Sequence, residues 1–160
     1  MRLRDYEPGD EPTVLALNAE SVAVLSPMDA GRFARLREAA ALLRVAEHEG
    51  TVAGFLMGFC AGSDYDSPNY RWFSDNFSDF FYVDRVVVDS TRRGLGLASA
   101  FYDECIAWAT AQQLTAIVAE IDIEPPNVGS LRFHEKYGFE EVDRLTHSAS
   151  KVVSLQRLSL

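Results

Sequence analysis

The sequence predicts one α/β domain over residues 1–160, in which helices flank a single mixed β-sheet. Three observations support this fold class. Strand-like runs of β-branched and aromatic residues alternate along the chain with stretches of helical periodicity. In the middle of the chain one helical stretch separates two strand patterns, and such a crossover makes the two strands parallel. Hairpin-like strand pairs lie on both sides of this unit and add antiparallel strands to the sheet.

The first half of the chain is predicted to form a short strand, two helices and a strand hairpin. Pro12 suits the first turn of a helix, and Asp29 is placed to cap the next one. A turn at His48-Glu49-Gly50 joins the two strands of the hairpin. The expected bounds are residues 3–6 for the first strand, 12–20 and 30–40 for the helices, and 43–47 and 51–60 for the hairpin.

Residues 61–78 are rich in Asp, Ser, Asn and aromatic residues and are predicted to form a long loop. Loops beyond about 12–15 residues are more often functional than filler. The acidic residues of this segment, together with Tyr70 and Trp72, would suit an amine with an apolar body. We therefore expect Tyr70 and Trp72 to contact a substrate. The alternative is a solvated loop whose aromatic side chains anchor it to the sheet.

The second half of the chain begins with the predicted central strand and continues with alternating helices and strands. The apolar stripe of the long helix includes Phe101, Tyr102 and Trp108, which we expect in the core. Gly138 is placed to end the last helix in the left-handed conformation. The expected bounds are residues 80–88, 115–123, 141–146 and 152–158 for strands, and 95–112 and a short stretch up to Tyr137 for helices.

A turn with two arginines and two glycines, Arg92-Arg93-Gly94-Leu95-Gly96, lies between the central strand and the long helix. Glycines let the backbone approach a ligand closely, and the free N–H groups of a helix N-terminus favour anions. The two arginines add fixed positive charge. The turn therefore predicts a binding site for a di- or polyphosphate.

Two common phosphate-binding patterns fit this turn poorly. The nucleotide P-loop places Lys and then Ser or Thr directly after its last glycine, where this chain has Leu97 and Ala98. The dinucleotide fingerprint needs three glycines that begin at the strand end, and this turn offers two. Glu120 or Asp122 could serve as its ribose-binding acid, so a dinucleotide remains a minor alternative.

A third pattern fits better. The segment from Thr91 to Gly96 resembles the pyrophosphate loop of the GCN5-related N-acetyltransferase (GNAT) family, (Gln/Arg)-x-x-Gly-x-(Gly/Ala), and departs from it at Thr91. The segment from Asn127 to Phe139 resembles the family's Asn-x-x-(Ala/Ser)-x-x-(Phe/Leu)-Tyr-Glu-Lys-x-Gly-Phe segment, with His134 in place of the tyrosine. The two motifs occur in the family's order, with a predicted helix and strand between them.

The resemblance implies two splayed parallel central strands that hold acetyl-coenzyme A. Its pyrophosphate would rest on the turn, and its pantetheine arm would run beside the central strand. The backbone N–H near Val88 could then polarise the thioester carbonyl. The implied cofactor-binding residues are Val86, Val87, Val88, Arg92, Arg93, Gly94, Leu95, Gly96, Leu97, Ala98 and Asn127.

Direct acetyl transfer needs a base that deprotonates the amine. Glu120 is the predicted base, because the resemblance places a catalytic glutamate on the second parallel strand. Asp122 and Glu124 share its face of the strand and are alternatives. Asp84 is a further candidate, and we expect it to face the substrate. The competing interpretation of Glu120 is a solvated acid at a strand edge.

The departing thiolate needs a proton or a hydrogen bond. His134 takes the position of the family's tyrosine, and the resemblance makes it the predicted acid. It could equally hydrogen-bond the sulfur without formal proton transfer. Tyr137, one helical turn later, is its predicted substitute. The competing interpretation is a surface histidine on a short helix.

The predicted function is an acetyl-coenzyme A-dependent N-acetyltransferase that transfers the acetyl group to a primary amine of a small molecule or peptide by direct attack. One alternative is an enzyme with a different acyl donor on the same scaffold. Another is an acyl-coenzyme A sensor or regulatory module without turnover, which Thr91 and the missing tyrosine favour.

Composition limits the partners. The net charge of −9 argues against a nucleic-acid partner, and no stretch approaches the length of a membrane span. Without a signal-like N-terminus, and with only Cys60 and Cys105, we expect a cytoplasmic location and no disulfide framework. No Cys/His cluster has metal-ligand spacing, so no metal is expected. An exposed edge strand could pair two copies into a homodimer.

Overall fold

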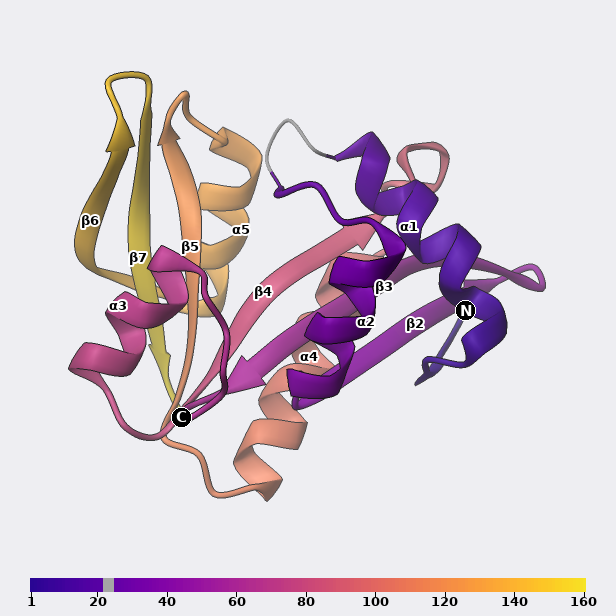
Figure 1. Cartoon of the computed structure of the whole chain (residues 1–160), viewed down its shortest axis with the longest axis horizontal. Helices are drawn as coiled ribbons and strands as arrows, with labels where there is room; N and C mark the ends of the chain where they lie inside the picture. Colours follow the sequence, from indigo (N-terminus) through magenta and orange to yellow (C-terminus); the bar gives the residue numbers. More distant parts are fainter. Residues whose placement is uncertain (22–24) are drawn as a thin grey trace.

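The computed structural model describes residues 1–21 and 25–160, which form a seven-stranded sheet flanked by five α-helices (Figure 1). The strands are β1 (Arg2–Asp5), β2 (Leu42–His48), β3 (Thr51–Cys60), β4 (Phe80–Val88), β5 (Ala116–Glu124), β6 (Glu140–Ser148) and β7 (Lys151–Ser159). The helices are α1 (Glu11–Glu20), α2 (Ala30–Ala39), α3 (Pro68–Asn76), α4 (Leu97–Ala111) and α5 (Val128–Tyr137). This is the α/β fold with a mixed sheet that the sequence predicts.

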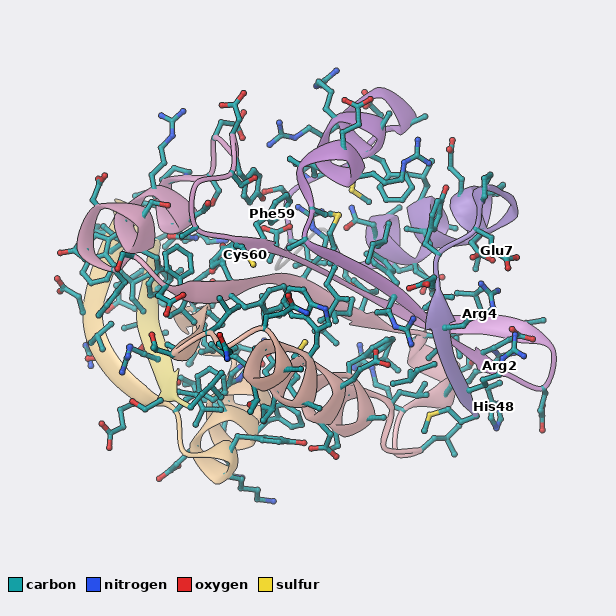
Figure 2. All side chains as sticks on the ribbon, turned by 90° about the horizontal axis from the view of Figure 1, so that it is seen from below. Arg2, Arg4, Glu7, His48, Phe59 and Cys60 are labelled. Carbon is teal, nitrogen blue, oxygen red and sulfur yellow. The ribbon has the colours of Figure 1, made fainter. Side chains whose placement is uncertain are left out.

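The strands follow the order β1-β2-β3-β4-β5-β7-β6, and β4 and β5 form the parallel pair at the centre. In the view of Figure 2 the strands run between two helical layers. Phe33 of α2 and Phe73 of α3 belong to the core on one face of the sheet, together with Val14 of α1. Phe101 and Cys105 of α4 belong to the core on the other face. The sheet is therefore buried on both faces, as a parallel centre requires.

The parallel pair is short. Only residues 80–82 of β4 pair with residues 116–118 of β5, and beyond these the two strands separate. This confirms the splay that the family resemblance implies. Because the ladder stops there, the backbone of β4 after Tyr82 has an edge that β5 does not cover.

A β-bulge accompanies the splay. Arg85 lies opposite Met57 and Val83 lies opposite Gly58, so Asp84 has no partner on β3. A bulged residue interrupts the alternation of side chains. Asp84 and Arg85 therefore both face the layer of α1 and α2, although they are neighbours in sequence. Side-chain contacts confirm this, since Arg85 reaches Asn18 of α1.

The structure corrects the prediction of a long loop over residues 61–78, because α3 forms within it. The Ser67 hydroxyl accepts a hydrogen bond from the Tyr70 N–H, and Pro68 occupies the first turn. Ser followed by Pro is a helix start signal, but Pro and Asn also favour turns. The predicted start of the helix at Leu95 is two residues early, because Gly96 adopts the left-handed conformation and caps α4.

The C-terminal part agrees with the predicted bounds to within a few residues. Gly138 ends α5 with φ at 93°, as expected from the sequence. The edge strand β6 is mostly exposed and presents Glu140, Glu141, Asp143 and Arg144. Charged side chains on an edge strand discourage pairing with another chain. The homodimer through an exposed edge strand stays a prediction. Among the described residues, no helix has the length and hydropathy of a membrane span.

Candidate active site

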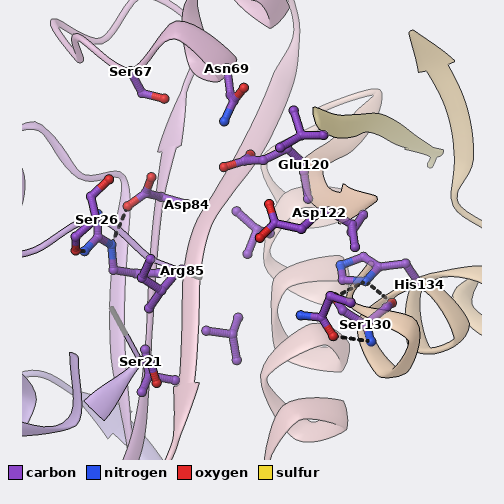
Figure 3. Close-up of a pocket in the computed structure, with 18 of the residues that line it drawn as sticks. Ser21, Ser26, Ser67, Asn69, Asp84, Arg85, Glu120, Asp122, Ser130 and His134 are labelled. Carbon is purple, nitrogen blue, oxygen red and sulfur yellow. Dashed lines mark hydrogen bonds and ion pairs between the residues drawn. The ribbon is translucent and has the colours of Figure 1, made fainter. Parts of the chain in front are cut away.

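A cavity of about 880 Å³ lies where β4 and β5 separate (Figure 3). We divide its wall into an α5 side and an α3 side. The α5 side comprises Val86, Val88, Ala98, Tyr102, Asn127, Ser130 and His134. The α3 side comprises Ser26, Arg32, Tyr65, Ser67, Asn69, Asp84, Arg85, Glu120, Asp122, His147 and Lys151. The residues named on the α5 side are thus uncharged, whereas the α3 side contains Arg32, Asp84, Arg85, Glu120, Asp122 and Lys151.

A smaller cavity of about 370 Å³ lies at the glycine turn and shares Val88, Arg93 and Ala98 with the larger one. Gly94 and Gly96 both have positive φ, at 85° and 77°, and no atom lies within 4 Å of where a Cβ would be. The Nη1 atom of Arg92 is buried, with no hydrogen-bond partner among residues 1–21 and 25–160. A buried guanidinium nitrogen without an acceptor, beside open backbone, fits a phosphate group.

Thr91, where the family pattern has Gln or Arg, has a local role in this turn. Its N–H and its hydroxyl both donate to Asp89 Oδ1, at 2.9 and 2.8 Å. Asp89 therefore caps the 3-10 turn over Ser90–Arg92 and fixes the approach to the glycines. The departure from the family pattern replaces a long polar side chain with a turn-closing contact.

Glu120 projects from β5 toward the cavity (Figure 3). The Tyr82 hydroxyl donates to its Oε2 atom at 2.6 Å. The pKa of Glu120 is raised to about 8. Burial is the main cause and the nearby charge of Asp84 contributes to the rise, while hydrogen bonds from Tyr82 and Asn69 act in the opposite direction. A carboxyl with this pKa is a stronger base when ionised than an ordinary glutamate.

Asn69, which sequence reasoning missed, lies at the start of α3 beside Glu120 (Figure 3). The Asn69 Oδ1 atom lies 2.9 Å from His147 Nε2 of β6. Since an amide oxygen only accepts, His147 donates, and the Asn69 amino group remains free to face Glu120. The residues that position the carboxyl thus come from three different segments of the chain.

Asp84, the alternative base, already has two donors. Its Oδ1 accepts from the Tyr65 hydroxyl at 2.5 Å and its Oδ2 from Arg85 Nε at 2.6 Å. The side chains of Asp84 and Arg85 are 5% and 3% exposed, and Arg85 Nη1 donates to Asn18. Both carboxylate oxygens are therefore occupied. Asp84 stabilises the buried guanidinium and is less available than Glu120 to accept a proton.

The other two acids of β5 are less suited to that task. Asp122 lies 3.8 Å from Lys151 Nζ, and its side chain faces the cavity from a position farther along the strand. Glu124 is exposed at the end of β5. A bulge at Ile123 interrupts the alternation that would place Glu124 on the face of Glu120. Glu120 lies in the cavity wall and has a raised pKa.

His134 is buried, 6% exposed, on the α5 side. Its Nδ1 atom lies 2.7 Å from the Ser130 carbonyl oxygen, which can only accept, so Nδ1 is protonated. Its Nε2 atom lies 2.6 Å from the Tyr102 hydroxyl. Burial lowers the pKa of His134, so the ring is neutral and the tyrosine donates. Both ring nitrogens of His134 are therefore engaged within the protein.

Three of the predicted catalytic and substrate-binding residues lie outside the cavity wall, and Leu95 of the predicted cofactor-binding residues is exposed and lines neither cavity. The Tyr137 hydroxyl donates to Asp103 at 2.9 Å on the outer side of α4. Tyr70 is in the core, 1% exposed, and its hydroxyl donates to the Cys60 carbonyl. Trp72 packs on Phe73 and Phe77. Helix formation within residues 61–78 turns Tyr70 inward, whereas Tyr65 and Asn69 of the same segment reach the cavity.

A sequence model of the Acetyltransferase (GNAT) family matches residues 12–139. The chain belongs to this family. It is therefore an acetyltransferase, and acetyl-coenzyme A is the acetyl donor that GNAT enzymes use. Among curated proteins, no sequence matches it closely enough to count as a relative.

Solved structures with similar folds support the GNAT architecture. Ard1 from Thermoplasma volcanium has a TM-score of 0.80 at 20% identity, over 99% of this chain and 97% of that one. The ribosomal-protein-alanine N-acetyltransferase from Brucella melitensis has a TM-score of 0.75 at 22% identity, with both chains fully covered. The putative acetyltransferase yncA from Salmonella typhimurium, solved with acetyl-CoA, has a TM-score of 0.72 at 19% identity, over 99% of this chain and 93% of that one.

The raised pKa of Glu120 makes the stability of this GNAT domain depend on pH. In the unfolded chain this glutamate has an ordinary pKa of about 4.3, so it releases its proton at lower pH than in the folded protein. The contribution of the neutral carboxyl is fully present below about pH 4.3. It is lost as the pH rises through about 8. The difference between the folded and unfolded pKa values limits this contribution to about 5 kcal/mol of the free energy of unfolding.

We expect the Glu120→Gln variant to lack this contribution to the pH dependence. Urea unfolding at pH 5, 7 and 9 would show the variant gaining stability relative to wild type as the pH rises. Glu124→Gln, an exposed substitution on the same strand, should have the same stability against urea as wild type at all three pH values. Parallel curves for wild type and Glu120→Gln would mean that Glu120 titrates like an ordinary glutamate.

Proposed function

We propose that this protein is an acetyl-coenzyme A-dependent N-acetyltransferase that transfers the acetyl group to a primary amine by direct attack. One observation supports this above all. The small cavity contains an Arg92 nitrogen that has no hydrogen-bond partner in the described part of the chain. It adjoins the larger cavity, whose wall includes the raised-pKa carboxyl of Glu120. An anion site at one end and a base at the other match a phosphate-bearing donor and an amine acceptor.

On this proposal the pyrophosphate of the donor lies on the backbone of residues 92–98, beside Arg92 and Arg93. The pantetheine arm runs along residues 86–88 of β4, where the splay leaves the strand edge uncovered. Asn127 caps α5 through its contact with the Ser130 N–H and lies in the same wall. The backbone N–H near Val88 would polarise the thioester carbonyl.

The acceptor amine enters the α3 side of the cavity and loses a proton to ionised Glu120. Its neutral nitrogen then attacks the acetyl carbon, the electron pair of the C–S bond moves to the sulfur, and the second proton of the nitrogen passes to solvent. Tyr82 holds Glu120 through one oxygen, which leaves Oε1 for the amine or an intervening water. The net charge of −9 favours the approach of a cationic amine.

Calorimetry and an enzyme assay would test this proposal. We expect acetyl-coenzyme A and coenzyme A to bind with micromolar affinity and NAD not to bind. Thiol release should then depend on an added amine in a panel of a small monoamine, a peptide N-terminus and an Nα-blocked lysine. Binding without turnover on any amine would favour the sensor alternative, and preferential binding of another acyl-coenzyme A would favour a different donor. Preference for NAD would contradict the proposal.

A further inference from the structure

Tyr102 of α4 is a buried residue with access to the cavity. It is 4% exposed and belongs to the α5 side of the cavity wall. Its ring packs edge-on against Phe133 and His134, with centroids 5.0 and 5.1 Å away. The apolar stripe of α4 explains its burial, but a tyrosine hydroxyl inside a core needs a polar partner. That partner is His134 Nε2, at 2.6 Å.

The direction of this hydrogen bond decides which group can serve a ligand. His134 donates its Nδ1–H to the Ser130 carbonyl and accepts the Tyr102 proton at Nε2. The neutral ring has no further N–H that could point into the cavity. Tyr102 has the only polar hydrogen of this pair that can turn toward a ligand, because rotation about its C–O bond frees it from Nε2.

We propose that Tyr102 is the residue that hydrogen-bonds the departing sulfur during acetyl transfer, with His134 as the positioning residue that holds its hydroxyl. This inference rests on the proposed function. In this chain a histidine occupies the tyrosine position of the α5 motif, and α4 places Tyr102, whose hydroxyl lies 2.6 Å from His134 Nε2, in the same wall of the cavity.

The chemistry requires no proton from Tyr102. The amine proton passes to Glu120, the new C–N bond forms, and the electron pair of the C–S bond moves to the sulfur. As negative charge grows there, the phenol O–H turns from the neutral imidazole to the thiolate, since charge-assisted hydrogen bonds are about twice as strong as neutral ones. Burial raises the pKa of Tyr102, so the phenol keeps its proton, and solvent protonates the thiolate after release.

Tyr102→Phe tests this role, because it removes the hydroxyl and keeps the ring. We expect kcat to fall about 100-fold, in the range seen for loss of one donor to a developing anion, with KM for acetyl-coenzyme A within about twofold of wild type. Tyr137→Phe is the matched control. It belongs to the same aromatic cluster, 5.7 Å from the Tyr102 ring, but its hydroxyl bonds to Asp103 outside the cavity. Equal kcat in the two variants would overturn the proposal.

His134→Gln provides a second readout that does not depend on Tyr102→Phe alone. If His134 acts through Tyr102, combining the two substitutions should lower kcat no further than Tyr102→Phe alone. Multiplying losses would overturn the positioning role, because they would show that His134 has a separate effect on the reaction.

Titration of the bound coenzyme A thiol separates this inference from the proposed function. The ultraviolet absorbance of the thiolate reports its pKa without any acceptor amine. We expect this pKa to be about one unit lower in wild type than in Tyr102→Phe, while Tyr137→Phe matches wild type. If no amine is acetylated but this difference is found, the proposed turnover fails and the sulfur contact stands. The same thiol pKa in all three proteins, or no binding of coenzyme A, would overturn the inference.

Discussion

Replacement of Glu120 by glutamine should lower kcat/KM by about 10²- to 10⁴-fold, the usual contribution of a positioned general base. Glutamine keeps the size of the side chain and can still accept the Tyr82 hydrogen bond at its carbonyl oxygen. The variant therefore loses the basic oxygen with little change in packing.

The pH profile identifies the cause of this loss. Because Glu120 must be ionised to accept a proton, and its pKa lies at about 8, wild-type kcat/KM should rise with pH and level off above about 8. Glu120→Gln should lack this rise, whereas Glu124→Gln should keep both the rate and the profile. A Glu120→Gln variant within about threefold of wild type would exclude Glu120 as the base.

Replacement of Gly96 by glutamate should weaken acetyl-coenzyme A binding by more than about 100-fold, or roughly 2.7 kcal/mol. Gly96 has φ at 77°, which costs other residues about 1–2 kcal/mol, and its N–H precedes the first turn of α4. The new carboxylate would also lie beside the expected pyrophosphate, where like charges repel.

The control for this variant is Gly62→Glu. Gly62 has φ at 83° and open space around its Cβ position, so it imposes the same backbone cost and the same charge at an exposed turn after β3. Calorimetric titration of both variants with acetyl-coenzyme A would separate the effect of backbone strain, which both variants share, from the loss of cofactor contacts at the turn of Gly96. Binding of Gly96→Glu within about fivefold of Gly62→Glu would mean that the donor does not use this turn.

The architecture was largely predictable because its signals are local. Periodicity, capping residues and the glycine turn are each determined within a few residues, and they give the elements and their order. The phosphate cradle was predictable for the same reason, since Arg92 to Ala98 lie in one continuous segment. Glu120 followed from its place on β5 and the resemblance, but its pKa depends on Tyr82, Asp84 and Asn69, which lie far away in sequence.

The remaining parts of the site depend on contacts that periodicity does not encode. A bulge in β4 places Asp84 and Arg85 on the same face of the sheet, and the sequence of the strand does not predict this bulge. Tyr102 fits an apolar helical stripe, and nothing in its neighbourhood reveals that its hydroxyl meets His134, 32 residues later. Tyr65 and Asn69 lie in a segment whose composition predicts a loop, so the sequence indicates an acidic and aromatic surface there but not which side chains reach the cavity.

The short ladder between residues 80–82 and 116–118 has a mechanical consequence. Strands β1 to β4 form one part of the sheet, or leaf, and strands β5 to β7 form the other. Among the described residues, the strands of the two leaves pair with each other only along this three-residue ladder, which we call the seam. Tyr82 belongs to the seam and donates to Glu120 across it. Any relative tilt of the leaves would therefore change the distance between the base and the strand edge of β4. Because the donor is expected to lie along that edge, a bound coenzyme would act as a spacer that sets the opening angle.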